Sequence, residues 1–367
     1  MKILHTSDWN LGKKFFGRDR FSEKKAVLAE IVKIAGEKKP DIVLIAGNTL
    51  GVLDAPPKCV ELLCETLTRL AAGGRRAVLL VSGGGDSAER LRAIARLADK
   101  QGISVITDPN AAPVKTNPSF PTKITASGAG YAEITCESGE RVSVSVVPYI
   151  GAAGYLSLKG DDLESKTAGV LAGNGSTAPV KIVLIHAARS DISAEKESGK
   201  LSERIFDGFM YVALGGADAG SGGKFFASGG ITDYDFSEKG RSVILAELTE
   251  EGLRSAEYVP LRAARRSKVI TVSGFGEAGK ALNGYKNCYT RLIISSDKSA
   301  DAAGAERLYG EFPLLADVVF NCVKAAEYAP PVFIDPSDKS VFADFLAKTG
   351  ADGSLSEIFG EIMEDNK

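Results

Sequence analysis

Histidine is unusually scarce in this chain, whose 367 residues include only two, His5 and His186. Because imidazole is a preferred ligand of divalent transition metals, so few histidines leave little material for a metal centre. The five cysteines include no CxxC pair, and their number is odd. This pattern favours unpaired, buried thiols in a reducing compartment over a disulfide framework.

Long apolar segments are also missing. No apolar run approaches the ~18 residues of a membrane-spanning helix, and the N-terminal stretch MKILHTSDW is too short and too polar for a signal peptide. An excess of one charge is missing too, since the formal net charge is −2. This balance predicts no overall attraction to nucleic acid or membrane, although it is compatible with a local basic face. We therefore expect a cytoplasmic protein without a membrane partner.

Glycine, by contrast, is abundant. It accounts for 40 of the 367 residues, a larger share than the average of about 7%. The hydrophobic content of 44% and the charged content of 25% are ordinary for a globular protein. A chain of this length can bury a large core and is long enough for two or three domains.

The first hundred residues alternate between short apolar runs and stretches with helical periodicity. This rhythm predicts a parallel sheet with crossover helices. Asp86, with Glu89 three residues later, is the expected N-cap of the third helix. The expected strands cover 2–7, 41–47, 76–82 and 103–107, and the expected helices cover 21–38, 57–70 and 86–102.

The pattern changes after Pro109. Two-residue alternation within 113–149 favours antiparallel strands, and a loop is expected over 151–179. The chain then returns to short apolar runs, which predict more strands. These lie at 181–187, at 209–216 and, as several short ones, within 225–260.

The last hundred residues are expected to fold separately. The cationic run from Arg262 to Lys268 indicates a solvated linker. Residues 268–327 predict a small α+β unit in the order strand, strand, helix, strand. Two short amphipathic helices are expected within 337–367, and their apolar faces suit either a core or a docking partner.

Polar or glycine-rich residues follow the predicted strands, where an open α/β sheet places its site. The stretch VSGGGDSAER (81–90) is similar to a phosphate cradle, because glycines precede the start of a helix. It lacks the GK[ST] of a P-loop and the GxGxxG of dinucleotide sites. Anion or nucleotide binding at this loop is one of three functional interpretations, and it rests only on the glycines before the start of a helix. The strand ends in question are 7–12, 46–48, 83–86, His186 and 215–218.

These strand ends carry a family resemblance. The opening MKILHTSDWNLGKKFFGRDRF resembles that of the SbcD family, the nuclease subunit of the bacterial SbcCD DNA-end-processing complex, within the two-metal calcineurin-like phosphoesterases. That family has DWHLG, GDxFD, GNHDS-ER, a lone histidine after an apolar strand, and YVALGHIH. Here the same frames read DWNLG, GNTLG, GGGDSAER, LIHA and YVALGGAD, in the same order, and the similarity extends over nearly the whole chain.

The resemblance implies a fold. It is an α/β metallophosphoesterase-type sandwich of two central sheets flanked by helices, with a small α+β capping domain and C-terminal helices. The corresponding ranges are 1–264 for the metallophosphoesterase-like domain, 265–330 for the capping domain and 331–367 for a helical tail that docks a partner.

The resemblance also implies a site for two Mn ions, most of whose ligands this chain has lost. Asp8 matches the first aspartate and His186 the lone histidine. A bridging carboxylate offsets the repulsion between two dications, and a neutral amide does not. The other positions hold Asn10 for a histidine, Asn48 for the bridging aspartate, Gly84 for the ligand asparagine, Gly85 for the catalytic histidine, and Gly216 and Asp218 for the final histidine pair.

We therefore expect no intact catalytic residue, and either no cofactor or one weakly bound divalent cation, with Asn10, Asn48 and Asp218 as its weak ligands. His5, on the first strand, is expected either to be structural or to support the metal-ligand residues from behind. The strands and caps remain mutually consistent while the ligands are gone, which favours a fold still in use without its metals.

The first functional reading is a catalytically inactive SbcD-like subunit that binds DNA ends or an ATPase. The resemblance implies an SbcC-like ABC ATPase with a long coiled coil as partner, and a homodimer. The alternative is a residual single- or two-metal Mn phosphodiesterase or exonuclease acting on DNA. Cations beside the site suit phosphate contacts or a solvated helix face. They are Lys13, Lys14, Arg18 and Arg20, followed by Lys24 and Lys25.

Overall fold

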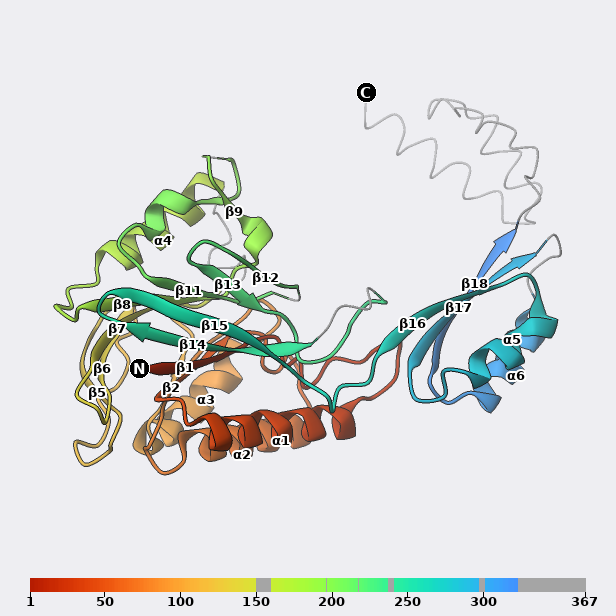
Figure 1. The fold of residues 1–367 in the computed structure, drawn as a ribbon, viewed down its shortest axis with the longest axis horizontal. Helices are drawn as coiled ribbons and strands as arrows, with labels where there is room; N and C mark the ends of the chain where they lie inside the picture. The colour runs from red at the N-terminus through yellow and green to blue at the C-terminus, as the bar shows by residue number, and fades with distance from the viewer. Residues whose placement is uncertain (150–159, 196, 217, 237–240, 297–300, 323–367) are drawn as a thin grey trace, which may run out of the picture.

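Figure 1 shows the computed structural model of the chain, which describes residues 1–149, 160–195, 197–216, 218–236, 241–296 and 301–322. Two large sheets pack face to face, and a third, smaller sheet lies to one side of them. No helix in these described ranges is long and apolar enough to cross a bilayer. The predicted C-terminal tail, 331–367, lies outside the described residues.

The first sheet has six strands in the order β15-β14-β1-β2-β3-β4. Strands β1 to β4 are parallel and linked by helices, which confirms the predicted alternation, while β14 and β15 extend the β1 edge in antiparallel fashion. The elements are β1 (Lys2–Thr6), α1 (Phe21–Lys38), β2 (Ile42–Ala46), α2 (Pro57–Ala71), β3 (Ala77–Val81), α3 (Ala88–Ala98), β4 (Ile103–Ile106), β14 (Ser242–Thr249) and β15 (Gly252–Pro260).

The second sheet has seven strands in the order β12-β13-β11-β8-β7-β6-β5. It is mixed, with β7, β8, β11 and β13 parallel to one another. Its strands are β5 (Lys123–Gly128), β6 (Tyr131–Thr135), β7 (Arg141–Val147), β8 (Val180–Ile185), β11 (Tyr211–Leu214), β12 (Ala219–Gly222) and β13 (Phe225–Ser228). A short two-stranded parallel sheet pairs β9 (Ile192–Ser193) with β10 (Leu201–Ser202). The 3₁₀ turns are η1 (Asp99–Gln101), which precedes β4, η2 (Arg189–Asp191) and η3 (Glu203–Phe206).

Alternation along the strands of the first sheet creates two cores. Ile3 and Leu44 face the second sheet, whereas their neighbours Leu4, Val43 and Ile45 face α1 and α2. Both sets are buried, as the continuous apolar runs predict. The expected sandwich of two central sheets flanked by helices is therefore confirmed.

The predicted loop over 151–179 is wrong in part, because α4 (Gly160–Ala172) lies within it. Leu163, Val170 and Leu171 of this helix pack against the outer face of the second sheet. Two glycines lower the intrinsic helix propensity of the segment, but burial of its apolar face stabilises the helix.

The third sheet consists of β16 (Ser267–Val272), β17 (Tyr289–Ser296) and β18 (Leu315–Cys322). The strands are parallel and joined by α5 (Phe275–Asn283) and α6 (Ala302–Glu311), which lie on the same side of the sheet in Figure 1. The predicted order omitted α5, whose glycines weaken the helical signal. This sheet has a hydrophobic cluster of its own, and the capping-domain boundaries stay predictions.

The connection between β15 and β16 is tethered to α1 and is therefore not the freely solvated linker expected. The backbone N–H groups of Arg262 and Ala263 donate to the Glu30 carboxylate, at 3.0 and 2.8 Å. The N–H of Arg265 donates to Glu23 at 2.8 Å. Two carboxylates on one helix thus fix the path of the chain into the third sheet.

The expected N-cap of α3 is also corrected. Ser87 is the cap, since its side chain accepts the N–H of Arg90 at 3.3 Å. The Asp86 carboxylate instead accepts four backbone N–H groups, from Thr49, Leu50, Gly51 and Gly83. Asp86 therefore joins the loops that follow β2 and β3.

His5 connects the two sheets through their shared core. Its Nδ1 accepts the hydroxyl of Tyr211, and its Nε2–H donates to the carbonyl of Leu214, both at 3.0 Å. Burial lowers the pKa of His5 to about 4, against which the bond to Leu214 acts only in part. The ring is thus neutral in the folded protein and structural, as expected.

This geometry predicts an acid-dependent loss of stability. The unfolded chain takes up a proton at His5 below pH ~6.5, whereas the folded chain does so only near pH 4. Stability from this group is present above pH ~6.5 and lost as the pH falls toward 4, by about 3 kcal/mol in total. Chemical denaturation of wild type and His5→Gln across this range measures it. We expect the wild-type curve to fall more steeply, and parallel curves would contradict the assignment.

Candidate functional site

Both sheets contribute to one polar cluster at the carboxyl ends of their strands. The first sheet supplies Asp8 after β1 and Asn48 after β2, and the second supplies His186 after β8 and Gly216 after β11. His186 Nδ1 lies 2.7 Å from the carbonyl of Ala46, across the junction of the sheets. The residues that the resemblance selects from distant parts of the sequence are therefore neighbours in space.

The loop after β1 runs alongside the loop after β2. The N–H groups of Asp8 and Asn10 donate to the carbonyls of Gly47 and Asn48, at 3.0 and 2.8 Å. Asp8, Asn10 and Asn48 all have positive φ, at 51°, 49° and 53°. Aspartate and asparagine tolerate this left-handed region better than other side chains. The backbone of the cluster thus restricts which residues it accepts.

Asp8 and Asn48 are joined by a hydrogen bond. The Asn48 amide donates from Nδ2 to Asp8 Oδ1 at 2.9 Å, while its Oδ1 accepts the N–H of Gly85 at 2.8 Å. The other Asp8 oxygen accepts the N–H of Gly216 at 2.7 Å. Both carboxylate oxygens of Asp8 are therefore occupied by donors of the protein itself.

Gly84 and Gly85, which are predicted to stand at family ligand positions, differ in the space around them. A Cβ at Gly84 would meet the ring of Tyr149 at 3.1 Å, and that side chain is exposed. A Cβ at Gly85 would lie 3.0 Å from the backbone oxygen of Gly51. A side chain at 84 needs only a movement of the ring, whereas one at 85 needs a movement of the loop after β2.

His186 keeps an orientation suited to ligand binding. Its Nδ1–H donates to the Ala46 carbonyl, which leaves Nε2 as the acceptor nitrogen of the neutral ring. The ring of Tyr149 packs edge-on against it, with centroids 5.9 Å apart. Tyr149 thus belongs to the cluster, although the sequence analysis did not select it.

Two further predicted ligands serve other contacts. Asn10 is buried, and its Nδ2 donates to the backbone carbonyl of Asp8, two residues earlier, at 3.1 Å. Its Oδ1 lies against Gly51, where a Cβ would approach to 2.2 Å. Asp218 is exposed and interacts with the charge of Arg241. Burial and the neighbouring charge of Arg20 lower the pKa of Arg241, whereas the charge of Asp218 raises it.

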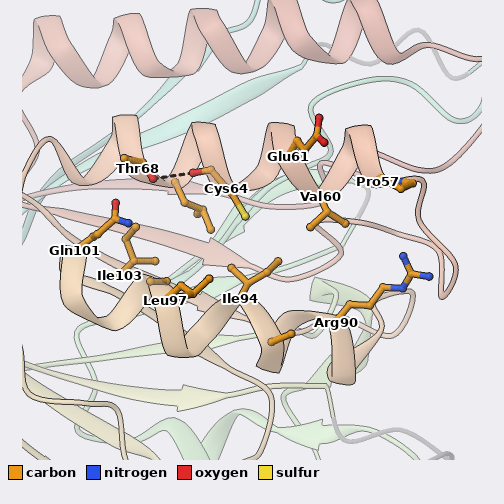
Figure 2. Close-up of a pocket in the computed structure, with 13 residues that line it drawn as sticks. Pro57, Val60, Glu61, Cys64, Thr68, Arg90, Ile94, Leu97, Gln101 and Ile103 are labelled. Carbon is orange, nitrogen blue, oxygen red and sulfur yellow. Dashed lines mark hydrogen bonds between the residues drawn. The ribbon is translucent and has the colours of Figure 1, made fainter.

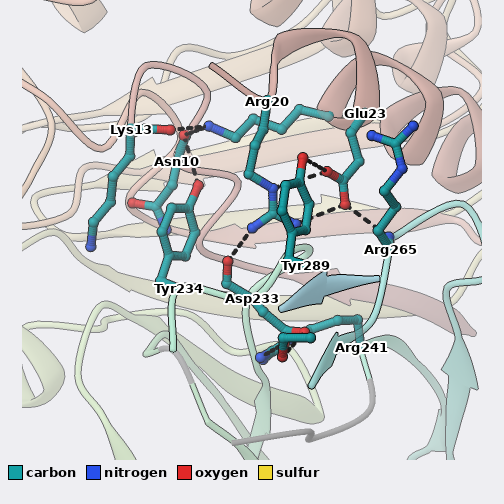
Figure 3. A network of polar contacts seen from close by, with 11 residues as sticks. Asn10, Lys13, Arg20, Glu23, Asp233, Tyr234, Arg241, Arg265 and Tyr289 are labelled. Carbon is teal, nitrogen blue, oxygen red and sulfur yellow. Dashed lines mark hydrogen bonds and ion pairs between the residues drawn. The ribbon is translucent and has the colours of Figure 1, made fainter. Parts of the chain in front are cut away.

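The cations beside the cluster divide into two groups, as Figure 3 shows in part. Arg20 is buried and bonds through two nitrogens to Glu23, at 2.9 and 2.7 Å. Lys24 is buried as well, and its ammonium donates to the carbonyls of the loop after β1, including that of Asn10 at 2.7 Å. These two side chains hold the fold together.

The remaining cations of this segment are more accessible. Arg18 donates to the carbonyls of Pro313 and Leu315 and so reaches the third sheet. Lys13 is exposed and lies over the ring of Tyr234, 4.6 Å from its centre. Lys14 is exposed too. Lys25 is exposed as well, on α1, whereas Lys13 and Lys14 lie in the loop that also carries Asp8 and Asn10 and are the side chains best placed for a ligand at the cluster.

A separate apolar groove lies between α2 and α3 (Figure 2). Its volume is about 670 Å³, and its lining includes Val60, Leu67, Ile94 and Leu97. No residue of the polar cluster lines it.

The donor set does not fit a pair of metal ions. In the described ranges, no group of three or more histidine, cysteine, aspartate or glutamate side chains lies together so as to hold one. The amide hydrogens of Asn48 point at Asp8, in the place where a bridging carboxylate would face two cations. The cluster is therefore held together by hydrogen bonds.

The structure thus combines two stacked sheets with one polar cluster at the carboxyl ends of their strands. No family model matches the chain. The chain is 35% identical over 114 residues to the SbcD component of the SbcCD nuclease from Bacillus subtilis (strain 168), a match that covers 31% of this chain and 29% of that protein. The chain thus matches less than a third of that relative's length. The crystal structure of TT1561 of Thermus thermophilus is similar at 12% identity and a TM-score of 0.42, over 71% of this chain and 99% of that chain. Over those 114 residues the chain is similar to this SbcD subunit, and the detected similarity is shorter than the nearly whole-chain resemblance expected from the motifs.

Asn48→Asp is expected to destabilise the protein in metal-free buffer. The change removes the donor to Asp8 and places two carboxylates in hydrogen-bond distance of each other, which costs about 2 kcal/mol or more. Chemical denaturation in the presence of a chelator measures the loss. Asn110→Asp is the matched control, because Asn110 is exposed, and its effect should stay within about 0.5 kcal/mol. Equal or greater stability of Asn48→Asp would show that the Asn48–Asp8 bond is unimportant.

Proposed function

We propose that this chain is a catalytically inactive SbcD-like subunit that binds DNA ends or a coiled-coil ABC ATPase of the SbcC type. The observation that carries the proposal is the hydrogen bond between Asn48 and Asp8. It joins the position of the expected bridging ligand to a retained ligand, and so stabilises the cluster without a cation.

The preserved frame supports a role in binding. The two large sheets, the helix cap of Ser87 and the hydrogen bonds of Asp86 are all formed. Glycine, in contrast, occupies positions 84, 85 and 216, where the family resemblance implies ligand or catalytic side chains. A fold that is selected for its binding surface would keep its frame and lose side chains only at ligand positions. Lys13 and Lys14 are the proposed phosphate contacts, since the other cations of their segment that were predicted to bind DNA hold the fold.

One observation favours a second candidate, a residual single-metal phosphodiesterase. His186 donates through Nδ1 and leaves Nε2 available, which is the arrangement common to metal-binding histidines. With Asp8 nearby, one weakly bound divalent cation is compatible with the cluster. No step of a two-metal reaction follows from this donor set.

Metal content and nuclease assays separate the two candidates. For the inactive subunit we expect no stoichiometric Mn²⁺ by titration calorimetry and no Mn²⁺-dependent shortening of linear duplex DNA. Two bound ions with cleavage abolished by Asp8→Ala would overturn it. One bound ion, with weak cleavage lost in both Asp8→Ala and His186→Ala, would instead establish the single-metal enzyme. Asp108→Ala, an exposed site, is the control variant.

Partner binding is tested by truncation before Pro336. The amphipathic pattern within 337–367 is the proposed docking segment, so the shortened chain should lose capture of a coiled-coil ABC ATPase encoded beside it. Co-purification of both chains measures capture, and circular dichroism checks that the sandwich is folded. Unchanged capture by the truncated chain would refute this docking segment.

A further inference from the structure

A second cluster of cations lies away from the lost metal site, where the chain passes from β15 into β16. A cavity of about 930 Å³ opens there. The residues that line it come from three parts of the chain: Asp233 and Arg241 ahead of β14, the connection from Pro260 to Arg266, and Ser267, Lys268, Tyr285 and Cys288 of the third-sheet segment.

The charges of this cavity are strongly unequal. Among the described residues of the lining, five side chains are cationic and one is a carboxylate, that of Asp233. That carboxylate is already paired with Arg241, as Figure 3 shows. A concave surface with this imbalance has a positive potential that concentrates anions. The cations are Arg241, Arg262, Arg265, Arg266 and Lys268.

Arg241 lies among charges of both signs. It is 9% exposed, and burial together with the neighbouring charge of Arg20 lowers its pKa, with Asp218 acting in the opposite direction. Asp233 and Asp218 offset the charge of Arg241, so the positive potential of the cavity rests mainly on the exposed guanidinium groups of the connection.

The backbone of the connection is fixed in advance of any ligand. Carboxylates of α1 accept the N–H groups of Arg262, Ala263 and Arg265. The loop is therefore held through its main chain, and the exposed guanidinium groups of Arg262, Arg265 and Arg266 are not needed to hold it. A preorganised loop of this kind lowers the entropic cost of binding.

We propose that this cavity binds a nucleotide-sized ligand carrying two or more adjacent phosphate groups. Guanidinium groups match phosphate oxygens in two-pronged hydrogen bonds, and three of them belong to the connection. The volume of about 930 Å³ suits a compact ligand better than a duplex. Tyr285, at 38% exposure, presents a ring for stacking on a base. This proposal uses no residue of the Asp8 cluster and is independent of the proposed function.

Calorimetric titration of the full chain with ATP tests the proposal. We expect one saturable site per chain, competition by tripolyphosphate and none by adenosine. Arg265→Gln with Arg266→Gln should weaken ATP binding by about tenfold or more, as expected for lost charge-assisted hydrogen bonds. Arg92→Gln with Arg96→Gln removes the same charge from exposed positions of α3 and should change the affinity less than about twofold. Thermal unfolding without ligand confirms that both variants fold.

A 20-base-pair blunt duplex forms the second arm. In the Arg265/Arg266 variant, we expect duplex binding to change less than ATP binding. The proposal is overturned if wild type shows no saturable ATP binding. It is also overturned if the α3 variant loses as much ATP affinity as the Arg265/Arg266 variant, or if adenosine competes with ATP and tripolyphosphate does not. Loss of duplex binding at unchanged ATP affinity would overturn it too and assign the cavity to nucleic acid.

Discussion

The buried ion pair between Arg20 and Glu23 is the contact on which the arrangement of the three sheets depends. Arg20 also donates to the carbonyl of Asp233, and Glu23 accepts the N–H of Arg265 and the hydroxyl of Tyr289. Burial acts to raise the pKa of Glu23, but the bonds and charge of Arg20 outweigh it, and the pKa lies below its ordinary value. One pair of charges thus joins α1, the segment before β14 and the third sheet. Its partners are mutually necessary, because either charge alone in this place would be costly.

The polar cluster at the strand ends obeys the same rule on a smaller scale. Buried polar groups need partners, and in this chain they find them within the protein. Asp86 gathers the N–H groups of two loops, and Asn48 uses both ends of its amide. These hydrogen bonds fix the loops in a single arrangement without the help of a bound metal ion. The resulting site is ordered by the protein's own donors and acceptors.

Much of the sandwich could be predicted from the sequence, because β1 to β4 carry apolar runs whose local pattern matches their burial on both sides. The neighbourhood of Asp8, Asn48 and His186 was predictable from their positions after predicted strands, and the family resemblance supplied the roles expected of them. Three features depend on tertiary contacts that no local pattern encodes. The helix α4 forms because it covers a sheet, Asp86 acts across loops instead of capping its own helix, and Arg20 and Lys24 are buried cations in a segment whose charge predicts exposure. Composition alone cannot separate a cation that binds phosphate from one that binds a carbonyl.

The difference between Gly84 and Gly85 sets the order in which an enzyme could be rebuilt from this chain. The position of Gly84 is bounded by a movable aromatic ring, and that of Gly85 by the backbone of Gly51. A first ligand is therefore accessible through a single substitution, whereas a second requires the loop after β2 to take another path. The N–H of Gly85 also donates to Asn48, so a substitution that moves this segment disturbs a hydrogen bond of the cluster. The two positions therefore differ in what a new side chain costs, and the loop after β2 sets the larger cost.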